Sequence, residues 1–266
     1  MKKVALITGA SAGMGKETAK LLTQNDYNVY GAARRLEKME DLKAFGVKPI
    51  AMDITKDETI VACVKQILDE TNGHIDILVN SAGFGSHGAI EDVPIKDAKY
   101  QLEVNVFGAM RLTQLVLPSM RENKFGKIVN ISSVGGKLAG PLGGWYHASK
   151  FALEGLSDSL RNEVRPFGID VILIEPGAIK SEWSKIAYDN LIKTSGRGAY
   201  KAMASKFANV IKNSDDKSSA PSVIAELIKK AIELRNPRAR YAKGHLAKPI
   251  LFIKKTVINN ICFCKQ

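Results

Sequence analysis

The stretch KVALITGASAGMG, residues 3–15, decides the fold of this chain. KVALIT (Lys3–Thr8) is a mostly apolar, β-branched run, which is typical of a strand buried on both faces of a parallel sheet. The glycines of TGASAGMG (Thr8–Gly15) follow at once and allow a sharp turn into a helix. A strand, a glycine-rich turn and a helix in this order predict a pyrophosphate site at the helix N-terminus. A turn without any ligand has the same composition, so the loop alone leaves both interpretations open.

Similar apolar runs recur along the first two thirds of the chain and alternate with helical patterns. The expected strands are Asn28–Ala33, Lys48–Met52, Ile75–Asn80, Lys127–Ile131 and Asp170–Ile174. The expected helices between them include Lys16–Thr23, Asp57–Thr71 and Lys96–Glu122. This order predicts an α/β fold with a doubly wound, mostly parallel sheet and helices on both faces.

The pattern changes after Pro176. Lys180–Ser219 has helical stretches without a strong strand, and Pro221–Leu234 is a helix with proline in its first turn. Arg238–Lys243 could form a last strand, and Pro249–Phe263 has helical spacing. We expect one domain over residues 1–266. Residues 1–179 would bind cofactor and catalyse, 180–220 would form a substrate lid, and 221–266 would add a helix, a strand and a basic amphipathic tail.

Composition excludes several classes of protein. The chain has 266 residues, of which 45% are hydrophobic and 25% charged, as in an ordinary soluble domain and unlike disordered, collagen-like or polytopic membrane proteins. The net charge is +12, yet residues 1–179 carry 21 basic and 21 acidic side chains, whereas residues 180–266 carry 18 and 6. Because the excess is confined to the last third, it indicates a local feature rather than a nucleic-acid-binding protein.

The cysteines and the N-terminus point to a reducing compartment. The three cysteines are Cys63, Cys262 and Cys264, and neither a disulfide framework nor a zinc site is expected from their spacing. MKKVALITGA is too short an apolar run for a signal peptide, and no window is long enough for a membrane span. We expect a cytoplasmic protein without a bound metal.

The end of the second expected strand indicates which dinucleotide would bind. An acidic residue there holds the ribose 2′-hydroxyl of NAD, whereas arginine suits the 2′-phosphate of NADP. The sequence reads GAARR (Gly31–Arg35), with Arg34 and Arg35 and no carboxylate. The cofactor is therefore predicted to be NADP(H), although a solvated arginine pair opening a helix is also common.

A second constellation lies further along the chain. Ser133 follows an expected strand, and Tyr146 and Lys150 occupy one face of a helix one turn apart. An ammonium close to a phenol favours the phenolate, so Lys150 is expected to lower the pKa of Tyr146 from its usual value near 10. Tyrosine would then exchange a proton at neutral pH as general acid or base.

These motifs together resemble the short-chain dehydrogenase/reductase family. The matches occur in family order up to Ile179: TGASAGMG, Asp53 in MDIT, NSAG at Asn80–Gly83, Asn105 in VNVFG, ISS at Ile131–Ser133, YHASK at Tyr146–Lys150, and PG at Pro176–Gly177. The GAARR start and the RYAKG…KPILF ending resemble the hydroxysteroid and retinol dehydrogenase-like branch. The resemblance implies a single-domain Rossmann fold.

The resemblance also assigns roles. It implies the catalytic residues Asn105, Ser133, Tyr146 and Lys150, in which Ser133 polarises the carbonyl and Asn105 anchors a water in a proton relay. It implies cofactor contacts from Gly9, Ser11, Gly13, Met14, Gly15, Arg34, Arg35, Asp53, Asn80, Ala82, Gly83, Tyr146, Lys150, Pro176, Gly177 and Ile179. It further implies a homo-oligomer, dimer or tetramer.

The substrate is expected to be a hydrophobic, in some cases anionic, alcohol or ketone such as a steroid, bile acid or retinoid. Candidate substrate contacts are Ser133, Leu142, Trp145, Tyr146 and Trp183, although such apolar residues are equally typical of a core. The basic C-terminal segment could steer anions or touch a membrane surface. Alternatives are a 3-oxoacyl thioester reductase, acting on acyl carrier protein or coenzyme A derivatives, and a non-catalytic NADP(H) sensor.

Overall fold

The computed structural model describes residues 2–254, with the backbone alone for residues 213–215. Within that part of the chain, seven parallel strands form one sheet in the order β3-β2-β1-β4-β5-β6-β7. The strands are β1 (Val4–Thr8), β2 (Asn28–Ala33), β3 (Lys48–Ala51), β4 (Ile77–Asn80), β5 (Gly126–Ile131), β6 (Ile169–Pro176) and β7 (Arg240–Lys243). The expected doubly wound α/β fold is confirmed. Because the strand order reverses between β1 and β4, a crevice is expected at their carboxyl ends.

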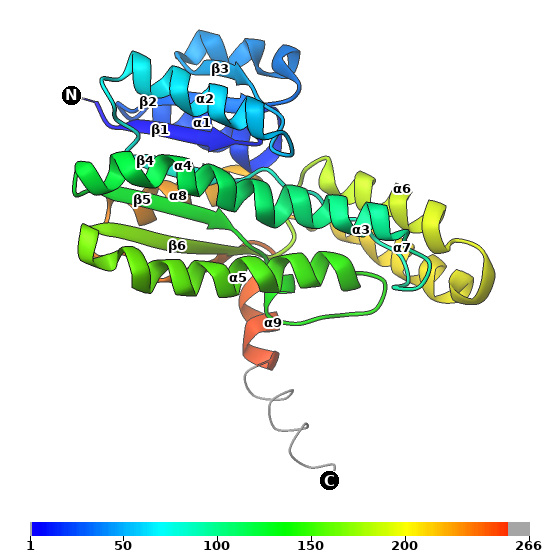
Figure 1. The fold of residues 1–266 in the computed structure, drawn as a ribbon. Helices are drawn as coiled ribbons and strands as arrows, with labels where there is room; N and C mark the ends of the chain where they lie inside the picture. The colour runs from blue at the N-terminus through cyan, green and yellow to red at the C-terminus, as the bar shows by residue number, and fades with distance from the viewer. Residues whose placement is uncertain (1, 255–266) are drawn as a thin grey trace.

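Helices cover both faces of this sheet (Figure 1). One face carries α1 (Gly13–Thr23), the short helix η1 (Leu36–Phe45) and α8 (Ser222–Glu233); the other carries α2 (Asp57–Glu70), α4 (Gly108–Glu122) and α5 (Gly144–Val164). The remaining helical segments are α3 (Ile95–Leu102), η2 (Glu103–Phe107), η3 (Val134–Gly136), η4 (Arg165–Phe167), α6 (Trp183–Ser195), η5 (Gly198–Tyr200), α7 (Lys201–Asp215) and α9 (Ala247–Ile253).

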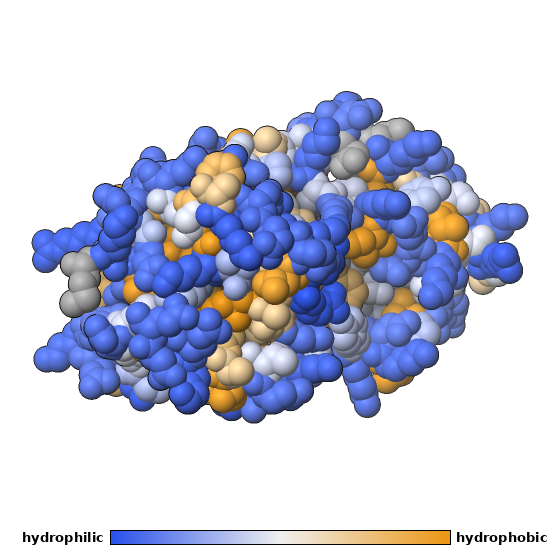
Figure 2. Space-filling view, turned by 90° about the horizontal axis from the view of Figure 1, so that it is seen from above, coloured by the Kyte–Doolittle hydropathy of each residue, from blue (hydrophilic) through white to orange (hydrophobic). Residues whose placement is uncertain are grey.

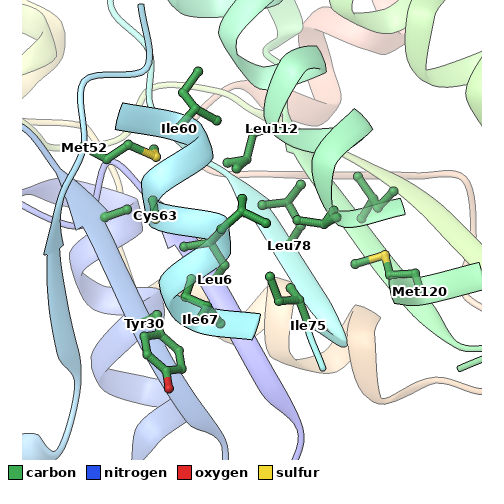
Figure 3. Packing of buried hydrophobic residues seen from close by; sticks show 14 of the residues in the cluster. Leu6, Tyr30, Met52, Ile60, Cys63, Ile67, Ile75, Leu78, Leu112 and Met120 are labelled. Carbon is green, nitrogen blue, oxygen red and sulfur yellow. The ribbon is translucent and has the colours of Figure 1, made fainter. Parts of the chain in front are cut away.

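The sheet divides the hydrophobic core into two clusters. Alternate side chains of β1 point to opposite faces, so Val4 and Leu6 join one cluster while Ala5 and Ile7 join the other. Figure 3 shows the first cluster, in which side chains of α2 and α4 close over strand residues such as Leu78. The central strands β1 and β4 are buried along their whole length, as the sequence pattern predicted, whereas the edge strands β3 and β7 are partly exposed.

Most expected elements are confirmed to within about two residues. The expected helix Lys96–Glu122 is interrupted by η2, a π-helical turn between α3 and α4. The last strand is confirmed as β7, which pairs with β6. Pro221 immediately precedes α8 rather than lying inside its first turn. Of Pro249–Phe263, the part up to Ile253 is helical in α9, and the end of that stretch lies outside the described residues together with Cys262 and Cys264.

The expected lid, residues 180–220, consists mainly of α6 and α7. These helices lie side by side beyond the sheet, at the end where the strands terminate (Figure 1). A third cluster, which includes Leu142, Leu191 and Ala204, packs them against the body. The segment predicted to be a lid therefore lies over the carboxyl ends of the strands.

The surface seen in Figure 2 is mostly hydrophilic, with separate hydrophobic patches. Among residues 2–254, no helix is long and apolar enough to cross a membrane.

Candidate active site

The loop between β1 and α1 forms one wall of the candidate site. Gly9 has φ +69°, a left-handed conformation that favours glycine, and a Cβ on Gly15 would lie only 2.6 Å from the Gly9 carbonyl oxygen. Helix α1 starts at Gly13 with no side-chain cap at Ala12 and no acidic residue in its first turn. Its first N–H groups are thus available to an anion, and the tight glycine packing fits the predicted dinucleotide.

The end of β2 adds two arginines to the same cavity. Arg34 donates a 2.8 Å hydrogen bond to the Tyr100 hydroxyl, and Arg35 lies 3.3 Å from the Ser11 hydroxyl. Arg35 is also ion-paired at 2.8 Å to Glu182, the residue immediately before α6. Lys38 binds the other oxygen of Glu182 at 2.8 Å. Hydrogen bonds from Lys38 and Arg35 lower the pKa of Glu182 to about 2.

Residues at the end of β4 have two roles: some bind the glycine loop through hydrogen bonds, and others line the cavity. The Thr8 hydroxyl accepts hydrogen bonds from the backbone N–H groups of Ser81 and Ala82 at 3.0 and 2.9 Å. The Asn80 side chain is buried and donates to the Asn130 side chain at 2.9 Å. Asn80 therefore ties β4 to β5, and its neighbours Ala82 and Gly83 line the cavity.

Two hydroxyl groups meet where β5 and α5 approach each other. Ser133 follows β5, and its Oγ accepts a 3.0 Å hydrogen bond from the Gly135 N–H, which caps the short helix η3. Tyr146 lies in the first turn of α5, and the Ser133 side chain is close enough to its hydroxyl to act on its pKa. Both residues line the cavity. A carbonyl oxygen placed there would meet two hydroxyl groups.

Lys150 lies one turn after Tyr146 and is buried behind it. Its Nζ donates a 2.8 Å hydrogen bond to the Ile131 carbonyl oxygen and lies 6.0 Å from the centre of the Tyr146 ring. Burial lowers the pKa of Lys150 to about 8, which the nearby Glu154 carboxylate partly opposes.

The pKa of Tyr146 is raised rather than lowered as the sequence predicted. Burial of the phenol is the main cause, and the nearby Ser133 side chain opposes it. The reason for the difference is that the desolvation of Tyr146 outweighs the effect of Lys150, which is itself buried and bound to a backbone carbonyl. The tyrosine is therefore protonated at neutral pH and able to donate.

Asn105 lies in η2. The sequence predicted this residue but not the π-helical form of the turn that carries it. Its amide nitrogen donates to the Phe84 carbonyl oxygen and to the Ser149 hydroxyl, both at 3.0 Å, and its oxygen accepts from the Phe84 N–H at 3.1 Å. Such turns are common at functional sites. Asn105 thus fixes the loop after β4 against α5.

The far end of the cavity is aromatic. Trp183 of α6 packs against His87 with ring centres 5.3 Å apart and against Tyr146 at 5.6 Å. Phe207 of α7 stacks on His87 at 5.9 Å. Sequence reasoning missed His87 and Phe207; the one available signal for His87 was its position four residues after Gly83, in the loop leaving β4.

These residues surround one cavity of about 680 Å³. Its lining includes the predicted residues Gly9, Ser11, Gly13, Met14, Arg34, Arg35, Asp53, Ala82, Gly83, Ser133, Tyr146, Pro176, Gly177, Ile179 and Trp183. The predicted residues Gly15, Asn80, Asn105, Leu142, Trp145 and Lys150 lie outside the lining. Leu142 packs in the third core cluster, and the Trp145 indole N–H is buried without a partner. In the described part of the chain, no cluster of three or more metal-binding side chains occurs.

Known proteins resemble this chain over most of its length. A family model described as short chain dehydrogenase matches residues 3–191. A 3-ketodihydrosphingosine reductase of Bacteroides thetaiotaomicron is 35% identical over 255 residues, which cover 95% of this chain and 91% of that protein. An NADPH-dependent 3-dehydrocapnine reductase of Ornithobacterium rhinotracheale is 34% identical over 253 residues, covering 90% and 87%.

Solved structures with a similar fold point to the same family. A short-chain dehydrogenase from Streptomyces avermitilis is 32% identical and has a TM-score of 0.87, with 98% of this chain and 95% of that one covered. Solved structures with this fold include complexes with NADP+ and with NAD, so the fold by itself does not fix the choice between them. The chain therefore belongs to the short-chain dehydrogenase family of oxidoreductases.

Proposed function

We propose that this chain is an NADP(H)-dependent oxidoreductase that interconverts a ketone and a secondary alcohol, or an aldehyde and a primary alcohol, on a hydrophobic substrate. The observation that carries the proposal is that Ser133 and Tyr146 line one cavity together, and that the other wall of this cavity is the glycine loop. Reduction of a ketone needs a hydride on carbon and a proton on oxygen. The bound nicotinamide supplies the hydride.

The side chains of this chain handle the proton. The hydroxyls of Ser133 and Tyr146 donate to the carbonyl oxygen, and Tyr146 passes its proton to that oxygen during reduction and takes one back during oxidation. The raised pKa of Tyr146 keeps it protonated at neutral pH, which suits the reductive direction. Lys150, held by Ile131, stabilises the phenolate left after transfer. Asn105 positions the loop that borders the reacting groups.

The preference for NADP(H) is supported by the end of β2. Arg34, Arg35 and the Ser11 hydroxyl line the cavity there, and that strand end provides no carboxylate for a ribose 2′-hydroxyl. The 3-dehydrocapnine reductase similar to this chain is named as NADPH-dependent. The arginines would bind the 2′-phosphate, and the N-terminus of α1 would bind the pyrophosphate.

The hydrophobic substrate is supported by the aromatic end of the cavity and by the relatives. Leu138, Trp183, Ile186, Phe207 and Ile250 contribute apolar lining. Two relatives are named for reducing 3-ketodihydrosphingosine and 3-dehydrocapnine. A steroid, a bile acid or a retinoid would also suit apolar walls. The alternative is a 3-oxoacyl thioester, which the excess positive charge of the last third would attract.

A homo-oligomer is part of the proposal. On η2 and α5, Phe107, Phe151 and Leu156 are between 42% and 58% exposed, and burying these large apolar side chains would stabilise a subunit interface. Sedimentation analysis tests this directly: a monomer at micromolar concentration contradicts it.

The experiment that tests the function follows NADPH oxidation with a panel of ketones. The panel contains a ketosteroid, a keto bile acid, retinal, 3-ketodihydrosphingosine and an acetoacetyl thioester. Tyr146→Phe is the blank, because it removes one hydroxyl and keeps the ring. Oxidation by the wild type that disappears in the blank supports the proposal, and the preferred compound identifies the substrate class. Turnover by Tyr146→Phe at the wild-type rate would overturn the assigned role.

A further inference from the structure

His87 is a polar residue at the aromatic end of the cavity that the proposed reaction does not use. It lies in the loop between β4 and α3, lines the cavity, and is only 4% exposed. Its ring stacks on Tyr146, with centres 5.8 Å apart and planes inclined by 30°. The imidazole therefore lies beside the hydroxyl group that would contact the reacting carbonyl.

The ring nitrogen Nδ1 of His87 has no hydrogen-bond partner among the described residues. Burial lowers the pKa of His87 to about 4; a hydrogen bond to the Gly85 backbone opposes this shift, and His147 adds to it. The imidazole is thus neutral at pH 7; its N–H serves the Gly85 backbone, which leaves one nitrogen lone pair to accept a hydrogen bond. Buried polar atoms usually have partners, so an unpaired nitrogen in a ligand cavity indicates a partner supplied by the ligand.

Among the described residues, the Ser132 hydroxyl also lines the cavity and is buried without a partner, but it follows β5 and lies outside the aromatic wall. Trp183, Phe207 and Ile186 present apolar surfaces, while the Ser133 and Tyr146 hydroxyls are the proposed donors to the reacting carbonyl itself. His147 is occupied as well, since its ring nitrogens contact the backbone of Gly135 and Gly140. His87 is therefore a polar point in an apolar wall, next to the place of reaction.

We propose that His87 determines specificity by hydrogen-bonding an amino or hydroxyl group on the carbon next to the reacting carbonyl. The substrate class is then a long-chain ketone with such a substituent. This inference rests on the proposed reductase function and narrows its substrate. It agrees with the relative named for 3-ketodihydrosphingosine, in which an amine neighbours the ketone.

The test uses three long-chain 3-ketones that differ only at the carbon next to the carbonyl, which carries an amine, a hydroxyl or hydrogens alone. The measured quantity is the ratio of kcat/KM for each substituted ketone to that for the unsubstituted one. Because it is a ratio, it does not depend on the fraction of folded enzyme. We expect a preference of about tenfold or more in the wild type, since a site built for a polar group discriminates against its absence.

Three variants complete the design. His87→Phe keeps an aromatic ring without nitrogen and should reduce the ratio to about one, whereas His87→Asn keeps a hydrogen-bonding group and should restore part of it. Val210→Ala changes an exposed side chain of the lid helix α7 that does not line the cavity, and it should preserve the ratio.

The outcomes separate the inference from the proposed function. A larger ratio for the amine or for the hydroxyl shows which group His87 binds. Equal ratios in the wild type and His87→Phe, or no preference in the wild type, overturn the inference while the reductase stands. If folded wild type oxidises NADPH with none of the panel ketones or these three, the proposed function fails instead.

Discussion

Glu182 of the lid is ion-paired to Arg35 of the β2 end, with 2.8 Å between Oε2 and Nη2. The next residue, Trp183, packs against Tyr146. The start of the lid thus contacts both the proposed phosphate-binding arginine and the proposed catalytic tyrosine. A 2′-phosphate bound by Arg35 would compete with this carboxylate, so the lid and the cofactor site are electrostatically connected.

Arg35→Ala is expected to reduce kcat/KM for NADPH by about 10–100-fold, because a hydrogen bond to a charged group is worth about 1.5–3 kcal/mol. The value for NADH should change by only a few fold, since NADH lacks the phosphate that Arg35 would bind. Steady-state kinetics with both cofactors check this. An equal loss with NADPH and NADH would show that Arg35 does not recognise the 2′-phosphate.

Glu182→Gln changes the partner of Arg35 in the ion pair and is expected to have the opposite effect on NADPH binding. It removes the charge that occupies Arg35 and Lys38 while keeping a side chain of similar shape. We expect NADPH to bind a few fold more tightly, as measured by fluorescence titration, and added salt to shrink the difference between variant and wild type. Weaker NADPH binding would mean that the carboxylate supports the site instead of competing for it.

Gly15→Ala tests the close packing of the glycine loop. The new Cβ would lie 2.6 Å from the Gly9 carbonyl oxygen and 2.9 Å from that of Thr8, so the backbone must move. We expect at least a tenfold loss of NADPH affinity and a lower melting temperature. Gly155→Ala is the control: nothing lies within 4 Å of its Cβ, and alanine in the exposed middle of α5 should raise stability by about 0.5–1 kcal/mol.

Periodicity predicted most of the fold because the strands are buried on both faces. Runs such as Lys3–Thr8 have no polar interruption, and glycine or proline marks their ends, so their bounds needed no tertiary information. The π-helical turn at Glu103–Phe107 escaped prediction because it contains no glycine or proline that would mark a break between α3 and α4. The turn is associated with tertiary contacts of Asn105 to Phe84 and Ser149.

The candidate site was predictable where a motif fixes the backbone and less so elsewhere. Ser133 and Tyr146 were expected to act on the same carbonyl, and both line the cavity. Whether an apolar residue lies in the core or in the cavity wall depends on tertiary packing, which the sequence pattern does not show. Leu142 belongs to the core under the lid, whereas Phe207, some 65 positions later in the chain, lines the cavity. The raised pKa of Tyr146 also depended on burial, which spacing along a helix cannot supply.

Leu78→Ala should destabilise the fold by about 2–5 kcal/mol, because its side chain is fully buried on the central strand β4 between α2 and α4 (Figure 3). Val61→Ala, on the neighbouring helix α2, is the control, since Val61 is 39% exposed and its truncation removes little buried apolar surface. Its unfolding free energy should stay within about 0.5 kcal/mol of the wild type. Urea denaturation measures both; similar losses would contradict the assigned packing.

Lys150→Met tests whether the active site lowers the stability of the fold. Burial lowers the pKa of Lys150 from 10.5 to about 8, so the folded state releases this proton before the unfolded state does. Below pH 8 both states are protonated, and folding has to bury an ammonium. Between pH 8 and 10.5 the unfolded state binds more protons, so the unfolding free energy of the wild type rises with pH, by about 3 kcal/mol in total.

Methionine has a similar length and no charge, so the variant lacks this pH dependence. The unfolding free energy of Lys150→Met minus that of the wild type should therefore fall by about 3 kcal/mol between pH 7 and 10.5. Loss of the hydrogen bond to Ile131 shifts this difference equally at every pH and does not change the fall. Urea denaturation across this range gives the difference, in which the other titrating groups cancel. If the unfolding free energies of the two proteins change with pH in parallel, Lys150 is not desolvated. In either case the variant should lose turnover, because the phenolate of Tyr146 would have no cation beside it.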